Sequence, residues 1–136
     1  MVEEFLNKIA IFQKKEIRRV IYNNEWWFSV VDVVQALIDQ PNDLKARKYW
    51  NKLSQRLNDE GSEVVTNCHR LKLFALDGKM RETDCANAEG LFRIIQSIPS
   101  PKAEPFKRWL AKVGYEKSET RKIPYSVIAR PQAVAI

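Results

Sequence analysis

The stretch WWFSVVDVVQALI, residues 26–38, decides the fold, because it carries a short aromatic strand directly into a helix. The Ser29 hydroxyl can accept a hydrogen bond from the first helical turn, and Asp32 supplies the acidic arm of a start that resembles a capping box. At about 100° per residue, one broad helix face gathers the apolar side chains, namely Val30, Val33, Val34, Leu37 and Ile38. We expect this helix to end before Pro41.

Upstream, residues 8–28 contain three short runs rich in isoleucine, valine and aromatic residues, separated by polar residues at 13–15 and 23–24. Such runs predict an antiparallel β-meander whose last strand is very short. Neighbouring side chains of a strand point to opposite faces, so Trp26 and Phe28 share one face. Most of these aromatic rings belong to the core in this interpretation. Trp27 is then the candidate for an outward ring on which a base could stack.

Downstream, residues 43–61 predict a basic helix that begins at Asp43 and ends at Gly61. Its apolar stripe contains Ala46, Trp50, Leu53 and Leu57. A second stripe, some ~125° away around the helix, contains the cations, namely Lys45, Lys48, Lys52 and Arg56. Asn51 and Gln55 lie on the outer surface near this stripe. The stripe is either a solvated helix face or a nucleic-acid interface, and its separation from the apolar stripe strengthens the second interpretation.

Residues 62–85 return to the alternating pattern of strands, with Asp77 and Gly78 between two alternating runs. This dipeptide is the strongest hairpin signal in the chain. A two-residue turn there fixes the register of the two strands. The predicted register places Leu76 opposite Lys79, Arg70 opposite Cys85, and Cys68 near Asn87.

Two more helices are expected before residue 114. Asn87 or Asp84 can cap the first one, whose apolar face contains Leu91, Ile94, Ile95 and Ile98. Prolines at 99 and 101 separate it from the second, whose apolar stripe contains Phe106, Trp109, Leu110 and Val113. The sequence therefore predicts an α+β fold in which a small antiparallel β-meander and a hairpin pack with about four α-helices.

Composition and charge set limits on the class of protein. The chain has 136 residues, of which 45% are hydrophobic and 29% charged, so we expect one folded domain. The net charge of +6 favours polyanionic partners such as nucleic acid. No apolar run approaches the roughly 20 residues of a membrane-spanning helix, and the start lacks the features of a secretory signal. We expect a cytoplasmic protein with reduced cysteines and no membrane partner.

The residues that could carry chemistry do not form a recognisable site. Cys68, His69 and Cys85 are the only soft-metal candidates, whereas tetrahedral zinc requires four ligands at characteristic spacings. Adjacent residues of a strand point to opposite faces, which argues against a cysteine–histidine nucleophile pair. The carboxylates are explained as caps and turns, and the four glycines form no phosphate-binding loop. We expect no enzymatic activity, no metal and no cofactor.

Two blocks of sequence resemble a known family. They are the strand-WF-x-x-x-D-helix opening at Trp27–Leu37 and the segment EGLFRII followed by SPKAEPFKRW at Glu89–Trp109. Both resemble the Bro-N family, the amino-terminal domain of phage antirepressors and baculovirus BRO proteins. The resemblance covers about residues 8–116 and implies a Bro-N-like domain at 1–116 and a C-terminal tail at 117–136. It also implies a role in phage or prophage gene regulation inside a bacterial host cell.

The end of the chain departs from the family pattern. Many Bro-N relatives continue after the tryptophan helix into a further block and then a separate carboxy-terminal domain. Here Val113 is followed by GYEKSETRKIPYSVIARP. We therefore expect a stand-alone module with a tail that is ordered only by packing or by a partner.

Two functions are compatible with the sequence and the resemblance. In the first, the module binds DNA, with the cationic stripe on phosphates and Asn51, Gln55 or Trp27 on bases. In the second, the module sequesters a repressor or host protein without specific DNA contact, through an apolar surface or through strand addition by the YSVIA segment of the tail. A symmetric homodimer fits either function. The separate basic stripe favours DNA binding.

Overall fold

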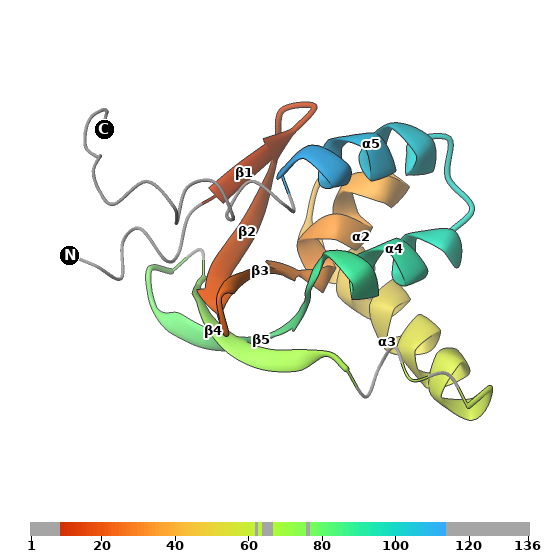
Figure 1. Cartoon of the computed structure of the whole chain (residues 1–136), viewed down its shortest axis with the longest axis horizontal. Coiled ribbons are helices and arrows are strands. Elements are labelled where there is room, and N and C mark those ends of the chain that lie inside the picture. The colour runs from red at the N-terminus through yellow and green to blue at the C-terminus, as the bar shows by residue number, and fades with distance from the viewer. Residues whose placement is uncertain (1–8, 62, 64–66, 76, 114–136) are drawn as a thin grey trace.

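The structure, a computed structural model, describes residues 9–61, 63, 67–75 and 77–113. Within those residues the chain forms five strands and four helices (Figure 1). In chain order they are β1 (Ile9–Phe12), β2 (Lys15–Tyr22), β3 (Glu25–Ser29), α2 (Val30–Ile38), α3 (Asp43–Asp59), β4 (His69–Phe74), β5 (Met80–Ala86), α4 (Ala88–Gln96) and α5 (Ala103–Val113). The predicted α+β fold is confirmed.

All five strands belong to one antiparallel sheet in the order β1-β2-β3-β5-β4. The first three strands form the predicted meander. Its two tight connections each contain two consecutive residues with positive φ, between 48° and 69°, as in type I′ hairpin turns. These residues are Gln13, Lys14, Asn23 and Asn24. The helices gather to the right of the strands in Figure 1.

The start of α2 confirms one half of its prediction and corrects the other. The Ser29 hydroxyl accepts a hydrogen bond from the Asp32 backbone N–H at 3.3 Å, as expected of an N-cap. The Asp32 carboxylate is not the second arm of a capping box. It accepts from Arg18 of β2 instead, through the Arg18 backbone N–H at 2.9 Å and through Nε and Nη2 at 2.8 and 3.0 Å.

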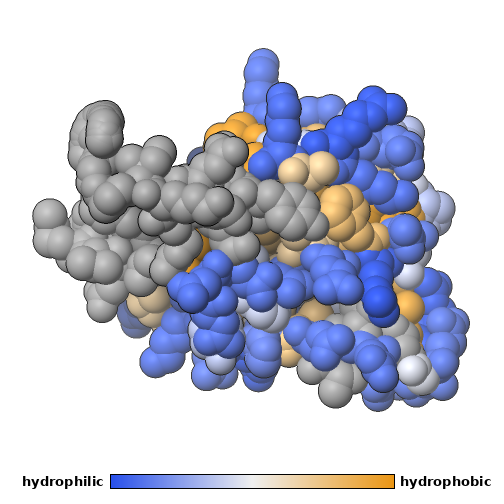
Figure 2. Space-filling view, viewed as in Figure 1, coloured by the Kyte–Doolittle hydropathy of each residue, from blue (hydrophilic) through white to orange (hydrophobic). Residues whose placement is uncertain are grey.

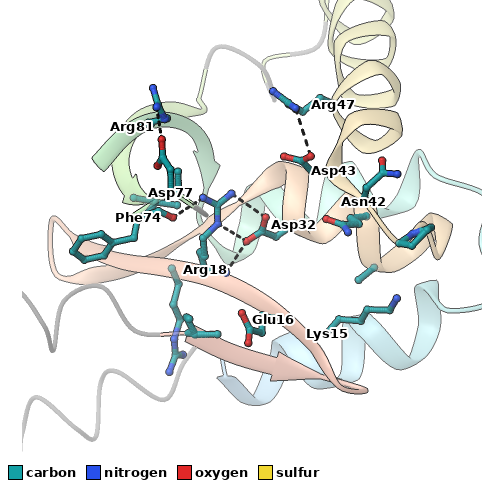
Figure 3. A pocket seen from close by; sticks show the side chains of 17 residues that line it. Lys15, Glu16, Arg18, Asp32, Asn42, Asp43, Arg47, Phe74, Asp77 and Arg81 are labelled. Carbon is teal, nitrogen blue, oxygen red and sulfur yellow. Dashed lines mark hydrogen bonds and ion pairs between the residues drawn. The ribbon is translucent and has the colours of Figure 1, made fainter. Parts of the chain in front are cut away.

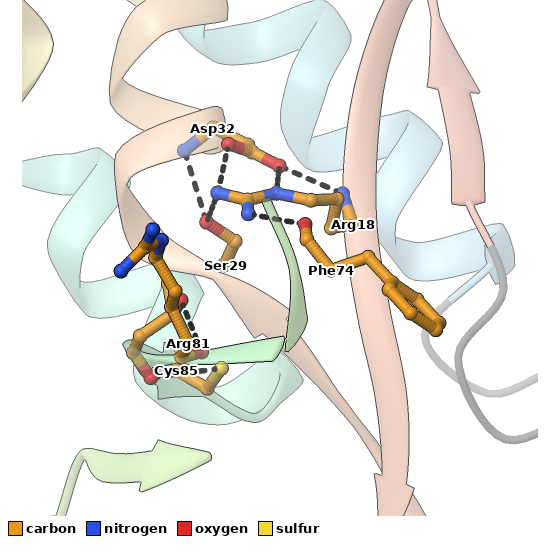
Figure 4. A network of polar contacts seen from close by, with 7 residues as sticks. Arg18, Ser29, Asp32, Phe74, Arg81 and Cys85 are labelled. Carbon is orange, nitrogen blue, oxygen red and sulfur yellow. Dashed lines mark hydrogen bonds and ion pairs between the residues drawn. The ribbon is translucent and has the colours of Figure 1, made fainter. Parts of the chain in front are cut away.

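Arg18 also reaches β4, which is not a neighbour of β2 in the sheet. Its Nη1 donates to the Phe74 carbonyl oxygen at 2.9 Å, and its Nη2 lies 3.4 Å from Ser29 Oγ (Figure 4). Burial alone would lower the pKa of Arg18, but the hydrogen bond and charge of Asp32 outweigh it and hold that pKa above its ordinary value. One guanidinium therefore joins β2, the start of α2 and the end of β4.

The two faces of the sheet carry separate cores. The main core lies between one face and the helices, and includes Trp26, Phe28 and the apolar faces predicted for α2, α3 and α4. The opposite face holds a small cluster of Trp27, Leu73 and Cys85, with Val20 and Leu71 packed against it. Because Leu71 and Leu73 belong to β4, the β4–β5 hairpin curls over this face. Trp27 is thus covered by the hairpin rather than by a helix.

The hairpin register differs by one residue from the prediction. His69, not Arg70, faces Cys85, and Arg70 faces Asp84. The Ala75 N–H donates to the Lys79 carbonyl at 2.8 Å and the Gly78 N–H donates to the Ala75 carbonyl at 2.9 Å. These bonds close a three-residue loop with Gly78 at φ +82°, where the prediction assumed two residues. Leu76, which was predicted to face Lys79, lies outside the described residues. The predicted proximity of Cys68 to Asn87 assumed the two-residue turn, so it is offset by the same one residue.

Helices α4 and α5 complete the main core. The Asn87 side chain accepts from the Gly90 N–H at 3.0 Å, so Asn87 and not Asp84 caps α4. Phe106 and Leu110 of α5 are fully buried, and Phe106 packs on Phe12 of β1 with ring centroids 4.6 Å apart. The other two residues of the predicted stripe, Trp109 and Val113, are partly buried against the same core.

Replacing Asp32 with asparagine should lower the free energy of unfolding by about 2–4 kcal/mol, because the half-buried Arg18 guanidinium loses its counter-charge. The Asp32 side chain is only 10% exposed. Urea unfolding measures the loss. The matched control is Asp39→Asn, which removes a carboxylate that is 62% exposed and keeps a residue suited to the positive φ there. Equal losses in the two variants would contradict the importance of the Arg18–Asp32 pair.

Candidate nucleic-acid interface

The basic helix α3 extends from Asp43 to Asp59. Its N-cap is Asn42, whose side chain accepts from the Leu44 N–H at 3.1 Å, so the predicted cap at Asp43 is one residue late. Asp43 lies in the first turn and forms an ion pair with Arg47 at 3.5 Å. Gly61 follows the end of the helix with φ +80°, a conformation that suits glycine. The helix boundaries thus agree with the prediction to within two residues.

The apolar stripe of α3 is buried as predicted, at Ala46, Trp50, Leu53 and Leu57. Trp50 also has a polar anchor. Its Nε1–H donates to the Asp84 carboxylate of β5 at 2.9 Å, and the other oxygen of that carboxylate lies 3.6 Å from Arg70 Nε of β4. The anchor fixes the rotation of α3 about its axis relative to the hairpin, and this rotation determines which residues face solvent.

The six α3 residues predicted to contact nucleic acid are all exposed: Lys45, Lys48, Asn51, Lys52, Gln55 and Arg56. Arg56 lies 4.0 Å from Glu60, an exposed pair of the kind that contributes little to stability. Among the described residues, no carboxylate forms an ion pair with Lys45, Lys48 or Lys52. Three ammonium groups on the exposed face of α3 are therefore available to an external anion. Their role in binding stays a prediction.

Trp27, the seventh candidate, lies in a different environment from the one expected. Its ring is on the face opposite to Trp26 and Phe28, as strand alternation predicts, but it is only 5% exposed. Its Nε1–H donates to the Tyr22 carbonyl at 3.0 Å, and its ring packs on His69 at 4.8 Å between centroids. The prediction of an outward ring is wrong because the curled hairpin covers this face, so Trp27 cannot stack on a base.

An open pocket of about 810 Å³ lies between the start of α3, β2 and the tip of the hairpin (Figure 3). Arg18 and Asp32 lie among its lining residues, together with Arg47 of α3 and Arg81 of β5. Each of these three arginines is paired with a carboxylate: Arg18 with Asp32, Arg47 with Asp43, and Arg81 with Asp77. Sequence reasoning missed the pocket, because its walls come from elements far apart in the chain.

The two cysteines, Cys68 and Cys85, are reduced thiols, one partly buried and one buried. The described residues contain no group of three or more histidine, cysteine, aspartate or glutamate side chains placed to hold a metal. Burial raises the pKa of Cys68 and of Cys85 to about 12, which keeps both thiols protonated near neutral pH. Protonated thiols are poor nucleophiles and poor metal ligands.

Both thiols should react slowly with Ellman's reagent at pH 8 in the native protein and rapidly after unfolding in urea, because a pKa of about 12 leaves only about 10⁻⁴ of each thiol as thiolate. Fast labelling of the native protein would contradict the burial of the thiols.

The folded protein holds the thiol protons of Cys68 and Cys85 more tightly than the unfolded chain, whose thiols have a pKa near 9.0. The free energy of unfolding should therefore fall as the pH rises from about 9 toward 12.

Replacing Trp50 with phenylalanine should keep most of the packing of α3 but leave Asp84 without its indole donor. We expect the free energy of unfolding to fall by about 1–3 kcal/mol, measured by urea unfolding. Leu44→Ala serves as the control, because Leu44 lies on the same helix but is 52% exposed. A loss no larger than that of the control would show that the Trp50 anchor does not hold the helix.

Comparison with known families gives one match. The family described as "BRO family, N-terminal domain" matches residues 16–116. No curated protein and no solved structure matches the chain. In the part of the chain that the structure describes, none of the helices combines the length and apolar character needed to cross a membrane.

Proposed function

Because the chain belongs to the BRO family through its N-terminal domain, we propose that it is a regulatory module that binds double-stranded DNA through the exposed face of α3. The family suggests a regulatory role of the antirepressor or DNA-binding type, without catalysis. The observation that supports DNA as the ligand is the row of exposed lysines Lys45, Lys48 and Lys52, which form no ion pair with any carboxylate of the described residues and lie on a different face of α3 from the stripe that anchors it in the core. The setting we propose is the cytoplasm of a bacterial cell that carries a phage or prophage.

The dimensions and side chains of α3 suit this function. Its 17 residues make a helix about 26 Å long, and the major groove of B-DNA, about 12 Å wide, admits one α-helix. The lysines and Arg56 would contact phosphates, which gives affinity without sequence specificity. Asn51 and Gln55 carry the amides that can pair in a bidentate manner with adenine, so we assign base recognition to them. With Trp27 buried, no base contact is assigned to the sheet face that it occupies.

The double variant Lys48→Glu/Lys52→Glu should weaken binding to a fluorescein-labelled duplex at least tenfold at about 0.1 M salt, because two phosphate contacts become repulsive. Fluorescence anisotropy across a salt series measures both the affinity and its salt dependence. The slope of log K against log salt should become shallower by about 2, since each lost phosphate contact accounts for about 0.9.

The control for this experiment carries the same change of charge on another helix. Arg108→Glu/Lys112→Glu alters two exposed cations of α5. If α3 is the interface, the α5 variant should lose much less affinity than the α3 variant. Equal losses would mean that net charge alone attracts DNA, and binding that is insensitive to both variants and to salt would refute the proposal.

A second candidate function is the sequestration of a repressor or host protein without specific DNA contact. The observation in its favour is β1, an edge strand with Ile9 and Ile11 exposed at 51% and 54%. An apolar edge strand can accept a further strand from a partner. The tail that was predicted to add such a strand lies outside the described residues. This function is favoured if the α3 variant still pulls down the repressor and if truncation of the chain after Glu116 abolishes that pull-down.

A further inference from the structure

The two edge strands of the sheet differ in charge. One edge is β4, which carries the exposed cations Arg70 and Lys72, and the other is β1, whose sequence IAIF contains no charged residue. Charged side chains on an edge strand discourage it from pairing with a second chain. Among the described residues β1 pairs only with β2, so one side of β1 has no strand partner there (Figure 1). The sheet thus has one edge protected by charge and one edge without that protection.

Two large apolar side chains project from β1. Burial alternates along the strand, so Ala10 and Phe12 are buried while Ile9 and Ile11 are exposed on the opposite face. Most of the described surface visible in Figure 2 is hydrophilic. Neighbouring exposed isoleucines on an uncharged edge strand are therefore the kind of surface that a further strand covers.

The same two isoleucines direct their backbone polar groups away from β2. The turn between β1 and β2 has two residues, so Phe12 and Lys15 on either side of it are a hydrogen-bonded pair of the ladder. Such pairs alternate with non-hydrogen-bonded pairs along antiparallel strands. Ala10 therefore also bonds to β2, whereas the N–H and C=O groups of Ile9 and Ile11 point outward.

We propose that β1 pairs antiparallel with β1 of a second copy of the chain, about a two-fold axis at Ala10, so that two five-stranded sheets join into one. This axis places Ile9 opposite Ile11 of the partner subunit and keeps the isoleucines of both copies on one face. The outward N–H and C=O groups of these two residues then bond to each other. The strand meets the requirements of face, backbone pairing and charge with its own sequence, which favours a second copy over an unrelated partner.

The next strand also suits the dimer. Glu16 of β2 lies beside Ile11, and Arg18 lies beside Ile9. Each row of side chains across the joined sheet therefore begins with a carboxylate of one copy and ends with a guanidinium of the other, so like charges do not face each other. Four paired residues bury much less than the roughly 1,200 Å² of a stable interface, so we expect a weak dimer with a Kd of about 10–100 µM. The dimer does not depend on DNA binding by α3.

Sedimentation of the full chain without DNA, from about 5 to about 500 µM, tests the proposal across the expected Kd. The average mass of the unmodified protein should rise from that of a monomer toward that of a dimer. Ile11→Lys should raise the Kd by about tenfold or more, because it places two ammonium groups in the interface. Phe74→Lys is the matched control, because it makes the same change of charge at a side chain 53% exposed, against 54% for Ile11, on the opposite edge strand β4. Circular dichroism should show that both variants fold.

Disulfide cross-linking tests the register. A mixture of the variants Ile9→Cys and Ile11→Cys should cross-link under mild oxidation, because hydrogen-bonded pairs place their Cα atoms about 5.5 Å apart, within the range of a disulfide. Either variant alone should cross-link much less, because its two cysteines lie diagonally across the axis, more than about 7 Å apart. The native thiols of Cys68 and Cys85 should compete little, because burial raises the pKa of each to about 12.

Four results would overturn the proposal. The first is a chain that stays monomeric over the whole concentration range, whatever its affinity for DNA. The second is a mass that grows beyond the dimer, which would mean that β1 of one copy meets β4 of the next. The third is an equal loss of dimer in Phe74→Lys, which would assign the effect to net charge. The fourth is a dimer that forms only after truncation at Glu116, which would assign the edge of β1 to the tail of the same chain.

Discussion

The Asp32 carboxylate accepts three hydrogen bonds from Arg18, one from its backbone and two from its guanidinium. Asp32 lies in the first turn of α2, so this pair fixes where the helix leaves the sheet. The same guanidinium donates to the Phe74 carbonyl and so holds the end of β4 against β2, across the opening of the curled sheet. The second core around Trp27 exists because the hairpin is held in this position.

From this junction the position of α3 follows. The C-cap of α2, Asp39, forms ion pairs with Lys15 and Lys102, whose hydrogen bonds and charges hold the pKa of Asp39 below its usual range. The short connection from Asp39 then leads into α3, and the Trp50–Asp84 hydrogen bond sets the rotation of that helix. The cationic stripe is exposed because the opposite stripe is anchored in this way. The proposed interface is thus a consequence of packing, not of charge alone.

Local patterns in the sequence predicted the helices and strands well. The Ser29 cap, the buried stripe of α3 and the meander all depend on the spacing of residues close together in the chain, and they are confirmed. The errors concern partners far apart in the sequence. The capping interpretation of Asp32 overlooked Arg18, 14 residues away, and the burial of Trp27 depends on Leu73. The prediction of the hairpin register was wrong by one residue because the dipeptide Asp77-Gly78 fits both a two-residue turn and the three-residue loop that forms.

The central claim is that α3 presents a DNA-binding face, and amide chemical shifts test it most directly. A ¹⁵N-labelled sample titrated with duplex DNA should show its largest shift changes along α3, at Lys45, Lys48, Asn51, Lys52, Gln55 and Arg56. The amides of α5 should change little. Changes that concentrate on β1 or α5 and spare α3, or no changes at all, would contradict the account.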